Sequence, residues 1–238
     1  NGLPASLAAK RILAGLPAGD LFAEPITSAD HHIPLNTLLK AVNGFDADSL
    51  SHQLRRLALA LPTHDFFDQV IVPLMATLNS RWAAAKPIDR VQEYLATETI
   101  RKLMHELCRM VRPSLARGSV LIAPFFNDVH VLPMDALAFL FNGRGFRTVQ
   151  LGPMTSPTAL TQVIQCTRPD LIAVSMTSRV SDTDLRPLLA EYELACKGTP
   201  WIIGGSGARF AQVLIDESSA TLVPDGRALD QYLESFLV

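Results

Sequence analysis

The sequence has few of the features that mark secreted, membrane or nucleic-acid-binding proteins. Its 238 residues include only three cysteines, Cys108, Cys166 and Cys196, which lie far apart and form no C-x-x-C pair. Neither a disulfide framework nor a zinc knuckle is therefore expected. No apolar run is long enough to cross a bilayer, and the formal net charge of −2 gives no basic field that would attract DNA. We expect a soluble, cytoplasmic protein without membrane contact and without specific DNA binding of its own.

The start of the chain also lacks a recognisable signal. It begins at Asn1 rather than methionine and has no basic-then-apolar leader, so we expect an excised piece of a longer protein. Residues 1–34 are predicted as an N-terminal extension that contains the pair His31 and His32. Adjacent residues point about 100° apart on a helix and no third ligand lies nearby, so an exposed linker is favoured over a metal site.

Residues 35–112 have the periodicity of helices. Apolar residues at mixed spacings of three and four predict four helices, and their short connections favour antiparallel neighbours. Asp46 and Thr63 suit N-caps, Pro87 suits the first turn of the fourth helix, and Pro73 should kink the third. We predict a four-helix bundle over this range.

From residue 118 the pattern changes to short apolar runs that alternate with segments of helical length. The runs predicted as strands are SVLIAPF, RTVQLGP, DLIAVSM, TPWIIGGSG and ATLVP. Near-continuous apolar strands that alternate with helices indicate a parallel sheet covered on both faces. We predict a doubly wound α/β domain over residues 118–238, in which ligands bind at the carboxyl ends of the strands.

An acid and an imidazole follow the first predicted strand, at Asp128 and His130 in FFNDVHVLP. Alone, such a histidine is most simply a loop residue with an ordinary hydrogen bond. Beside a carboxylate it resembles a metal ligand whose second ring N–H is held by an acid. One histidine cannot make a zinc site, which needs three or four protein ligands. The pair thus favours a metal that brings its own equatorial ligands, as in haem or a corrinoid.

The order of the motifs resembles the cobalamin-binding module shared by methionine synthase, corrinoid methyl carriers and B12-dependent photoreceptor regulators. That family has D-x-H-x-x-G, then S-x-L or S-x-T, then G-G. This chain has DVHVLP, then SMT at 175–177, then GG at 204–205, and the likeness covers residues 35–238. It implies a helical bundle followed by a flavodoxin-like, Rossmann-like domain with a five-stranded parallel sheet.

The resemblance also implies a role for each matching residue. His130 would replace the cofactor's own dimethylbenzimidazole as the lower axial ligand of cobalt, with Asp128 hydrogen-bonded behind it. The other cofactor-binding residues of these motifs would be Val131, Pro133, Ser175, Thr177, Gly204 and Gly205. The serine and threonine would bind the displaced nucleotide tail, and the glycines would let the tail approach the backbone, although they also suit a strand-to-helix turn.

The chain departs from the family pattern in the residues expected at both faces of the cofactor. Pro133 stands at the glycine position of the first motif, where it adds bulk and weakens the case for a methyl carrier. Trp82 and Glu93 match the bundle motif that caps the upper corrin face, although a lone tryptophan is often simply core. Ala83 and Tyr94 stand where related proteins have histidines, so we expect hydroxo- or aquocobalamin to be favoured over adenosylcobalamin.

The function implied by the resemblance is that of a cobalamin-binding regulator, not an enzyme, which responds to light or to redox state. The chain resembles antirepressors of photosynthesis genes, which act through a repressor protein, and no helix-turn-helix pattern precedes the bundle. The alternative is the corrinoid subunit of a methyltransferase, which carries a methyl group on cobalt. A degenerate domain that binds haem or nothing is a third reading.

Overall fold

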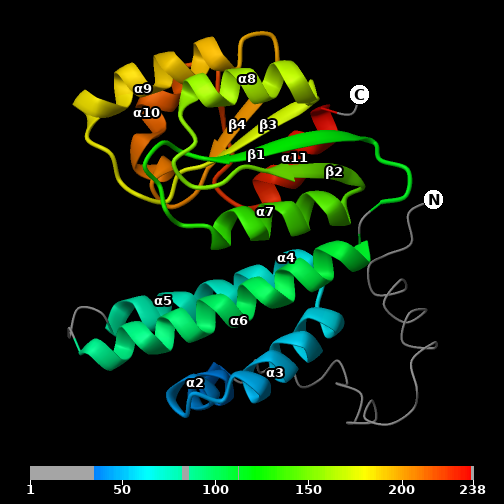
Figure 1. Cartoon of the computed structure of the whole chain (residues 1–238), viewed down its shortest axis with the longest axis vertical. Helices are drawn as coiled ribbons and strands as arrows, with labels where there is room; N and C mark the ends of the chain where they lie inside the picture. The colour runs from blue at the N-terminus through cyan, green and yellow to red at the C-terminus, as the bar shows by residue number, and fades with distance from the viewer. Residues whose placement is uncertain (1–34, 82–85, 112, 237–238) are drawn as a thin grey trace. The chain divides into compact units, whose positions relative to one another are not determined.

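The computed structural model describes residues 35–81, 86–111 and 113–236, which divide into two compact units with a boundary after Val111 (Figure 1). The first unit is helical, and the second contains a parallel sheet with helices on both faces. Trp82, Ala83 and the pair His31 and His32 lie outside the described residues. Within those ranges, no helix combines the length and the apolar character that a membrane crossing requires.

The helical unit contains the four helical segments predicted from the sequence. The carboxylate of Asp46 accepts a hydrogen bond from the amide of Ser49, as predicted for an N-cap, and the fourth segment begins at Pro87. Thr63 is the first residue of its helix rather than the cap before it. The elements are α2 (Leu35–Asn43), α3 (Ala47–Ala60), α4 (Thr63–Phe66), η1 (Phe67–Ile71), α5 (Val72–Arg81) and α6 (Pro87–Val111).

The third helical segment is interrupted beside Pro73, where the sequence predicted a kink. The five residues of η1 form a π-helical turn, in which the amide of Val72 donates to the carbonyl of Phe67. Proline has no N–H and its ring clashes with the preceding turn, so regular α-helical hydrogen bonding cannot continue through this position. The wider turn keeps the segment helical on both sides of the proline.

The α/β unit has a five-stranded, wholly parallel sheet in the order β2-β1-β3-β4-β5. This is the flavodoxin-like order, so the predicted fold class is confirmed. The strands are β1 (Gly118–Pro124), β2 (Phe146–Gln150), β3 (Leu171–Ser175), β4 (Trp201–Gly204) and β5 (Thr221–Leu222). The helices are α7 (Leu132–Gly143), α8 (Pro157–Thr167), α9 (Asp182–Ala195), η3 (Ala208–Ala211), α10 (Gln212–Asp216) and α11 (Gly226–Phe236).

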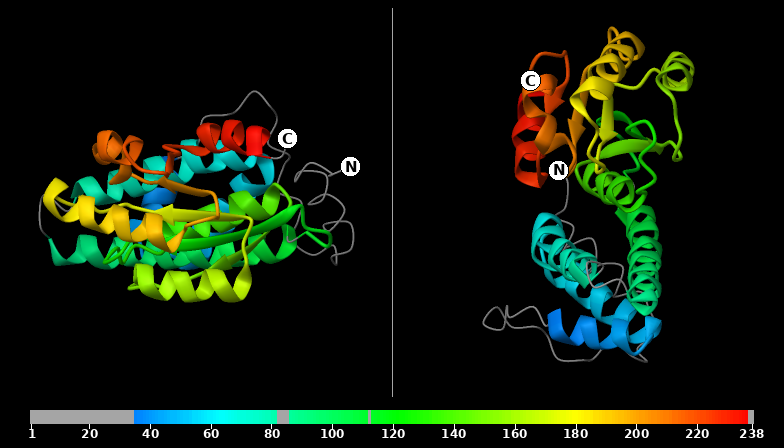
Figure 2. Two further views of the ribbon diagram at one scale, coloured as in Figure 1. Left: turned by 90° about the horizontal axis from the view of Figure 1, so that it is seen from above. Right: turned by 90° about the vertical axis from the view of Figure 1, so that its left-hand side faces the viewer.

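Helices cover both faces of this sheet (Figures 1 and 2). Helices α8, α9 and α10 lie on one face, while α7 and α11 lie on the other and are joined by an ion pair between Arg144 and Asp230. Every residue of β3 is buried, as are the last five of β1. The continuous apolar runs that predicted these strands thus reflect burial on both faces. Helix α11 was not predicted; it buries Leu229 and Leu233, four residues apart on one side.

Candidate functional site

The candidate site lies at the carboxyl ends of β1 and β3. In this sheet β2 lies on one side of β1 and β3 lies on the other, so the strand order reverses between them. Ligands bind at such switch points because the loops that leave the two strands diverge to opposite faces. The loop after β1 carries Asp128 and His130, and the loop after β3 carries Thr177 and Ser178.

The Asp128 carboxylate accepts five hydrogen bonds, three from the loop after β3 and two from His130 in its own loop. Its Oδ2 accepts from the amide and the hydroxyl of Thr177, at 2.6 and 2.5 Å, and from the amide of Ser178 at 3.0 Å. Its Oδ1 accepts from the amide of His130 at 3.1 Å and lies 2.6 Å from Nδ1 of the same residue. Only 3% of the Asp128 side chain is exposed. The carboxylate is therefore fixed in position by the protein itself.

These contacts set the ionisation of Asp128. Burial by itself would raise the pKa of this carboxyl group, because it disfavours the charged form. The hydrogen bonds from Thr177, His130 and Ser178 outweigh burial and lower the pKa to about 2. At neutral pH the group is an anion, which can only accept hydrogen bonds.

The ionised carboxylate decides which ring nitrogen of His130 carries the proton. Nδ1 lies 2.6 Å from an oxygen that can only accept, so Nδ1 carries a hydrogen and donates it. In the neutral ring, Nε2 then holds a lone pair. The side chain is 58% exposed, in contrast to the buried aspartate beside it. The arrangement leaves Nε2 as an imidazole nitrogen of fixed tautomer, which is chemically able to bind a metal.

The segment from Gly204 to Gly207 supports the loop after β3 from behind. The carbonyl of Met176 accepts hydrogen bonds from the amides of Gly207 and Ala208, and the hydroxyl of Ser206 donates to the carbonyl of Thr177. These contacts hold in place the two residues that bind Asp128.

The close packing of this segment explains why it contains glycines. A Cβ atom on Gly204 would lie 2.4 Å from the carbonyl oxygen of Val223, and one on Gly205 would lie 2.4 Å from that of Met176. A Cβ on Gly207 would lie 2.2 Å from the oxygen of Ser178. Gly205 also has a φ of +113°, which side chains of L-residues rarely adopt. The protein's own backbone therefore requires glycine here, whatever the segment binds.

The remaining residues of the three motifs lie around the same strand ends. Ser175 is buried as the last residue of β3, paired with Pro124 and Gly204 on the neighbouring strands. Val131 is the N-cap of α7, and Pro133 is in the first turn of that helix, where proline is tolerated. The proposed contacts of these residues and of Thr177 with a nucleotide tail stay predictions. The Thr177 hydroxyl donates its hydrogen to Asp128, so only its lone pairs are available to a ligand.

The helical unit contributes a different kind of surface. On the exposed side of the first half of α6, Ile88, Val91 and Tyr94 are 51%, 55% and 68% exposed. Their spacing of three places them along one side of the helix. Glu93, predicted to contact the cofactor, is partly buried between Gln92 and Tyr94. We call Ile88, Val91 and Tyr94 the α6 apolar face.

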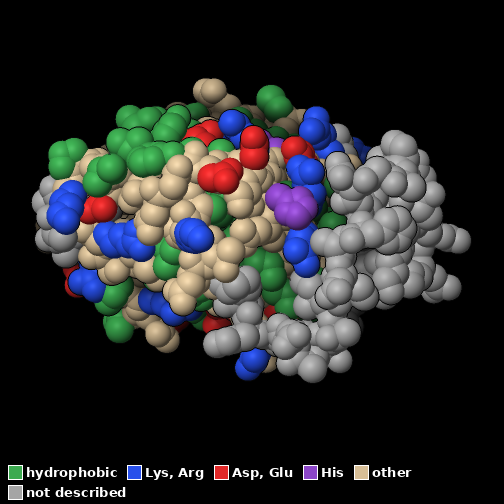
Figure 3. All heavy atoms as spheres, turned by 90° about the horizontal axis from the view of Figure 1, so that it is seen from below, with side chains coloured by type: hydrophobic (Ala, Val, Ile, Leu, Met, Phe, Trp, Pro, Cys, Tyr) green, Lys and Arg blue, Asp and Glu red, His purple; other side chains and the backbone are tan. Residues whose placement is uncertain are grey.

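The outward surface of α6 changes character toward its C-terminus. Lys102, His105 and Arg109 follow the apolar face along the same helix and are exposed. Figure 3 shows one face of the molecule, on which hydrophobic side chains gather in one region and Lys, Arg and His side chains lie in others. Large apolar side chains left in water at regular spacing indicate a surface that becomes covered.

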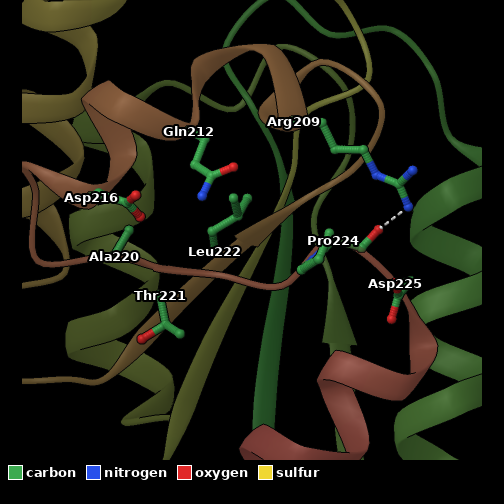
Figure 4. A pocket seen from close by; sticks show the side chains of 8 residues that line it. All are labelled: Arg209, Gln212, Asp216, Ala220, Thr221, Leu222, Pro224 and Asp225. Atoms are coloured by element: carbon green, nitrogen blue, oxygen red, sulfur yellow. Dashed lines mark hydrogen bonds between the residues drawn. The ribbon is translucent and has the colours of Figure 1, made fainter.

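The chain also has a hollow of about 710 Å³ beside the edge strand β5. Figure 4 shows Gln212 and Asp216 of α10 at its rim, together with Arg209, which donates a hydrogen bond to the carbonyl of Pro224. Its lining contains none of the residues predicted for the site. His130 is not among its lining residues, so this hollow is separate from the candidate site.

The side chains near His130 that could ligate a metal restrict the kind of metal centre that fits. Among the described residues, no three His, Cys, Asp or Glu side chains converge as they would around a bare metal ion. A metal held at His130 by the described residues alone would have to arrive with most of its ligands already bound. The sequence analysis did not identify the Ser178 amide or Gly207 as parts of this site. A backbone donor carries no side-chain signal, and Gly207 lies outside the G-G motif.

Comparison with known proteins relates the chain to transcriptional repressors. No protein-family model matches it. It is 26% identical over 181 residues to the HTH-type transcriptional repressor CarH of Myxococcus xanthus, and 24% identical over 169 residues to the HTH-type transcriptional repressor CarA of the same organism. The matches cover 76% and 71% of this chain, but 60% and 57% of the repressors. The chain thus spans less than two thirds of the length of these relatives.

The fold is shared with a solved corrinoid protein. The monomethylamine corrinoid protein of Methanosarcina barkeri superposes with a TM-score of 0.60 at 15% identity, over 83% of this chain and 96% of that protein. The chain has the fold of a corrinoid protein. The resemblance inferred from the D-x-H, S-x-T and G-G motifs is confirmed at this level.

Proposed function

We propose that the chain binds cobalamin, with Nε2 of His130 as the lower axial ligand of cobalt. The observation that carries this proposal is the hydrogen bond from Nδ1 to the buried Asp128. It leaves the lone pair of Nε2, on a side chain that is 58% exposed, available to a metal. Cobalamin supplies a cobalt ion that already has four equatorial ligands and an exchangeable upper ligand. A single imidazole matches what such a centre still needs, and no cluster of three ligands is required.

The motif resemblance also names residues that would hold the rest of the cofactor. Val131, Pro133, Ser175, Thr177, Gly204 and Gly205 would lie around the nucleotide tail, according to the motif resemblance. We propose that the α6 apolar face, with Glu93 and Trp82 beside it in the sequence, covers the upper side of the corrin. The exposure of Ile88, Val91 and Tyr94 supports this role, because a flat apolar ligand would remove them from water.

We further propose a regulatory role in the cytoplasm, exerted through a repressor protein. The similarity to CarH and CarA, both transcriptional repressors, supports a function in transcription. The formal net charge of −2 argues against tight DNA binding by this chain alone. Sequence-selective binding to DNA at physiological salt would contradict this proposal and favour a direct regulator.

A methyl-carrier role is the second candidate, because the fold is that of the monomethylamine corrinoid protein. Fold does not decide function, since the same scaffold serves several chemistries. Pro133, at a position where the motif has glycine, favours the regulatory role. Exposure of the reduced, cobalamin-loaded chain to a methyl donor and a methyl acceptor separates the two. Repeated methyl transfer would favour the carrier, and its absence the regulator.

The cobalt ligand is tested with His130→Ala and a matched control, His52→Ala, on the exposed side of α3. The chain is loaded with hydroxocobalamin and reduced to Co(II), and electron paramagnetic resonance then reports the axial nitrogen. We expect a protein nitrogen coupling in wild type and in His52→Ala, and its loss in His130→Ala. The same coupling in all three proteins would show that His130 is not the ligand.

The upper face is tested by absorption spectra of chain mixed with hydroxo-, methyl- and adenosylcobalamin, before and after illumination. We propose that hydroxo- or aquocobalamin binds best, because Ala83 and Tyr94 replace histidines of related proteins. A clear preference for adenosylcobalamin in the dark, with a bis-histidine spectrum after photolysis, would refute this assignment. A spectral change on illumination or on reduction identifies the signal.

A further inference from the structure

A buried tyrosine on α9 lies directly beneath the root of the histidine loop. Tyr192 is fully buried, with its ring stacked between Phe125, whose ring centre is 5.0 Å away, and Trp201 at 6.1 Å. The two interplanar angles are 17° and 15°, so the three rings form one nearly parallel stack. Phe125 is the first residue after β1, so the stack reaches from the helix layer to the start of the loop.

The Tyr192 hydroxyl binds the main chain at the end of β1. It donates a hydrogen bond to the carbonyl of Pro124 at 3.2 Å, one residue before Phe125. Burial raises the pKa of this phenol, so it stays protonated and remains a donor. One side chain thus holds two consecutive residues, Pro124 through a hydrogen bond and Phe125 through a ring stack.

The clamped residues lead directly into the site. The amide of Phe125 donates to the carbonyl of Ser175 on β3, and the carbonyl of Phe125 accepts from the amide of Asp128. Asp128 is then held at the other end of the turn by Thr177 and Ser178. The loop that presents His130 is therefore anchored at two points. One is the Asp128 carboxylate and the other is Tyr192.

We propose that Tyr192 is a positioning residue, which holds the root of the Phe125–Val131 loop so that the imidazole of His130 is presented in one orientation. Its effect on cobalt ligation rests on the proposed function, whereas its effect on the loop does not. A ligand held by a rigid support loses less freedom on binding, so affinity depends on residues that never touch the ligand.

The loop itself is tested in the cofactor-free chain by hydrogen–deuterium exchange of Tyr192→Phe. The change removes the hydroxyl but keeps the ring in the stack. We expect amides of residues 126–131 to exchange about threefold to tenfold faster, the range that one net hydrogen bond supplies. Tyr232→Phe, a matched change on α11, should leave this segment unaltered. Unchanged exchange, or equal acceleration in β4 and across the whole α/β unit, would overturn the proposal.

The effect on ligation is then read from the Co(II) spectrum of the hydroxocobalamin-loaded protein. We expect Tyr192→Phe to lower the fraction of centres with an axial protein nitrogen, and Tyr232→Phe to match wild type. If wild type shows no such nitrogen, the proposed function fails while the exchange experiment still decides the role of Tyr192. If Tyr192→Phe does not fold, Phe125→Leu removes the ring stack and keeps the hydrogen bond from the Tyr192 hydroxyl to the carbonyl of Pro124. Its loop should then exchange faster than wild type, and unchanged exchange would again overturn the proposal.

Discussion

The histidine loop of the α/β unit and the apolar face of α6 differ in how complete each is without a ligand. In the loop, every contact that orients His130 is already made: Asp128 is buried and accepts five hydrogen bonds. On α6, three large apolar side chains remain in water. The histidine loop is therefore already ordered without a ligand, whereas the α6 apolar face still has apolar surface that a ligand or a partner could bury.

This difference follows from the local chemistry of each region. Buried carboxylates are costly unless they are fully hydrogen-bonded, so Asp128 is stable only within a complete set of donors. Exposed apolar side chains on a helix carry no such requirement, because the helix is held by its other side. There, Ile100, Leu103 and Met104 are buried. A substitution should therefore alter folding in the first region and only binding in the second.

The largest expected effect comes from breaking the support behind the loop with Gly205→Ala. The new Cβ would meet the backbone oxygen of Met176 at 2.4 Å, at a φ of +113°. Backbone cannot move aside as a flexible side chain does, so we expect a loss of about 3 kcal/mol in the free energy of unfolding. Urea denaturation measures it.

The control for this change is Gly152→Ala, where a Cβ would meet no atom within 4 Å. It should alter the free energy of unfolding by no more than about 0.5 kcal/mol. Equal stabilities for the two variants would mean that the 204–207 segment is not tightly packed against the loop after β3. The histidine loop would then be less rigidly supported in the absence of a ligand than its contrast with the α6 apolar face requires.

A smaller effect is expected from Asp128→Asn, which replaces an acceptor-only group by one with two donors. The amide nitrogen would face donors of Thr177, Ser178 or His130, so we expect a loss of about 2 kcal/mol at pH 7. The folded-state pKa of Asp128 is lowered from 3.8 to about 2, so the stabilisation is present above pH 4. This pH-dependent contribution to the free energy of unfolding is about 2 kcal/mol, and it is lost as pH falls from about 4 to 2.

The measurement is the free energy of unfolding of wild type and variant between pH 2 and 7. The stability difference between them should shrink below pH 4 and be nearly gone at pH 2. Asp216→Asn, at an exposed carboxylate on α10 with no hydrogen bond to the site, is measured alongside as the control. A constant gap between wild type and Asp128→Asn down to pH 2 would show that the charge of Asp128 does not stabilise the fold.

The same contrast explains what the sequence could reveal. Strands β1 and β3 are buried on both faces, so their apolar runs predicted the parallel sheet, and Asp128 and His130 stood out as polar residues at a strand end. The donors that complete the site are largely backbone groups, such as the Ser178 amide, which any residue supplies. The sequence analysis did not single out Tyr192, because its contacts with Pro124 and Phe125 depend on how α9 packs over β1.

The smallest expected effect tests the apolar half of the comparison with Val91→Gln. The side chain is more than half exposed, so the variant should unfold within about 0.5 kcal/mol of wild type. If the α6 apolar face covers the corrin, the lost burial of half a valine side chain should weaken hydroxocobalamin binding about fivefold. Val72→Gln is the matched control, because this valine of α5 is 57% exposed and lies outside the α6 face. Titration followed by absorbance compares the three proteins. Equal affinities for all three proteins would contradict the proposal that the α6 apolar face covers the corrin.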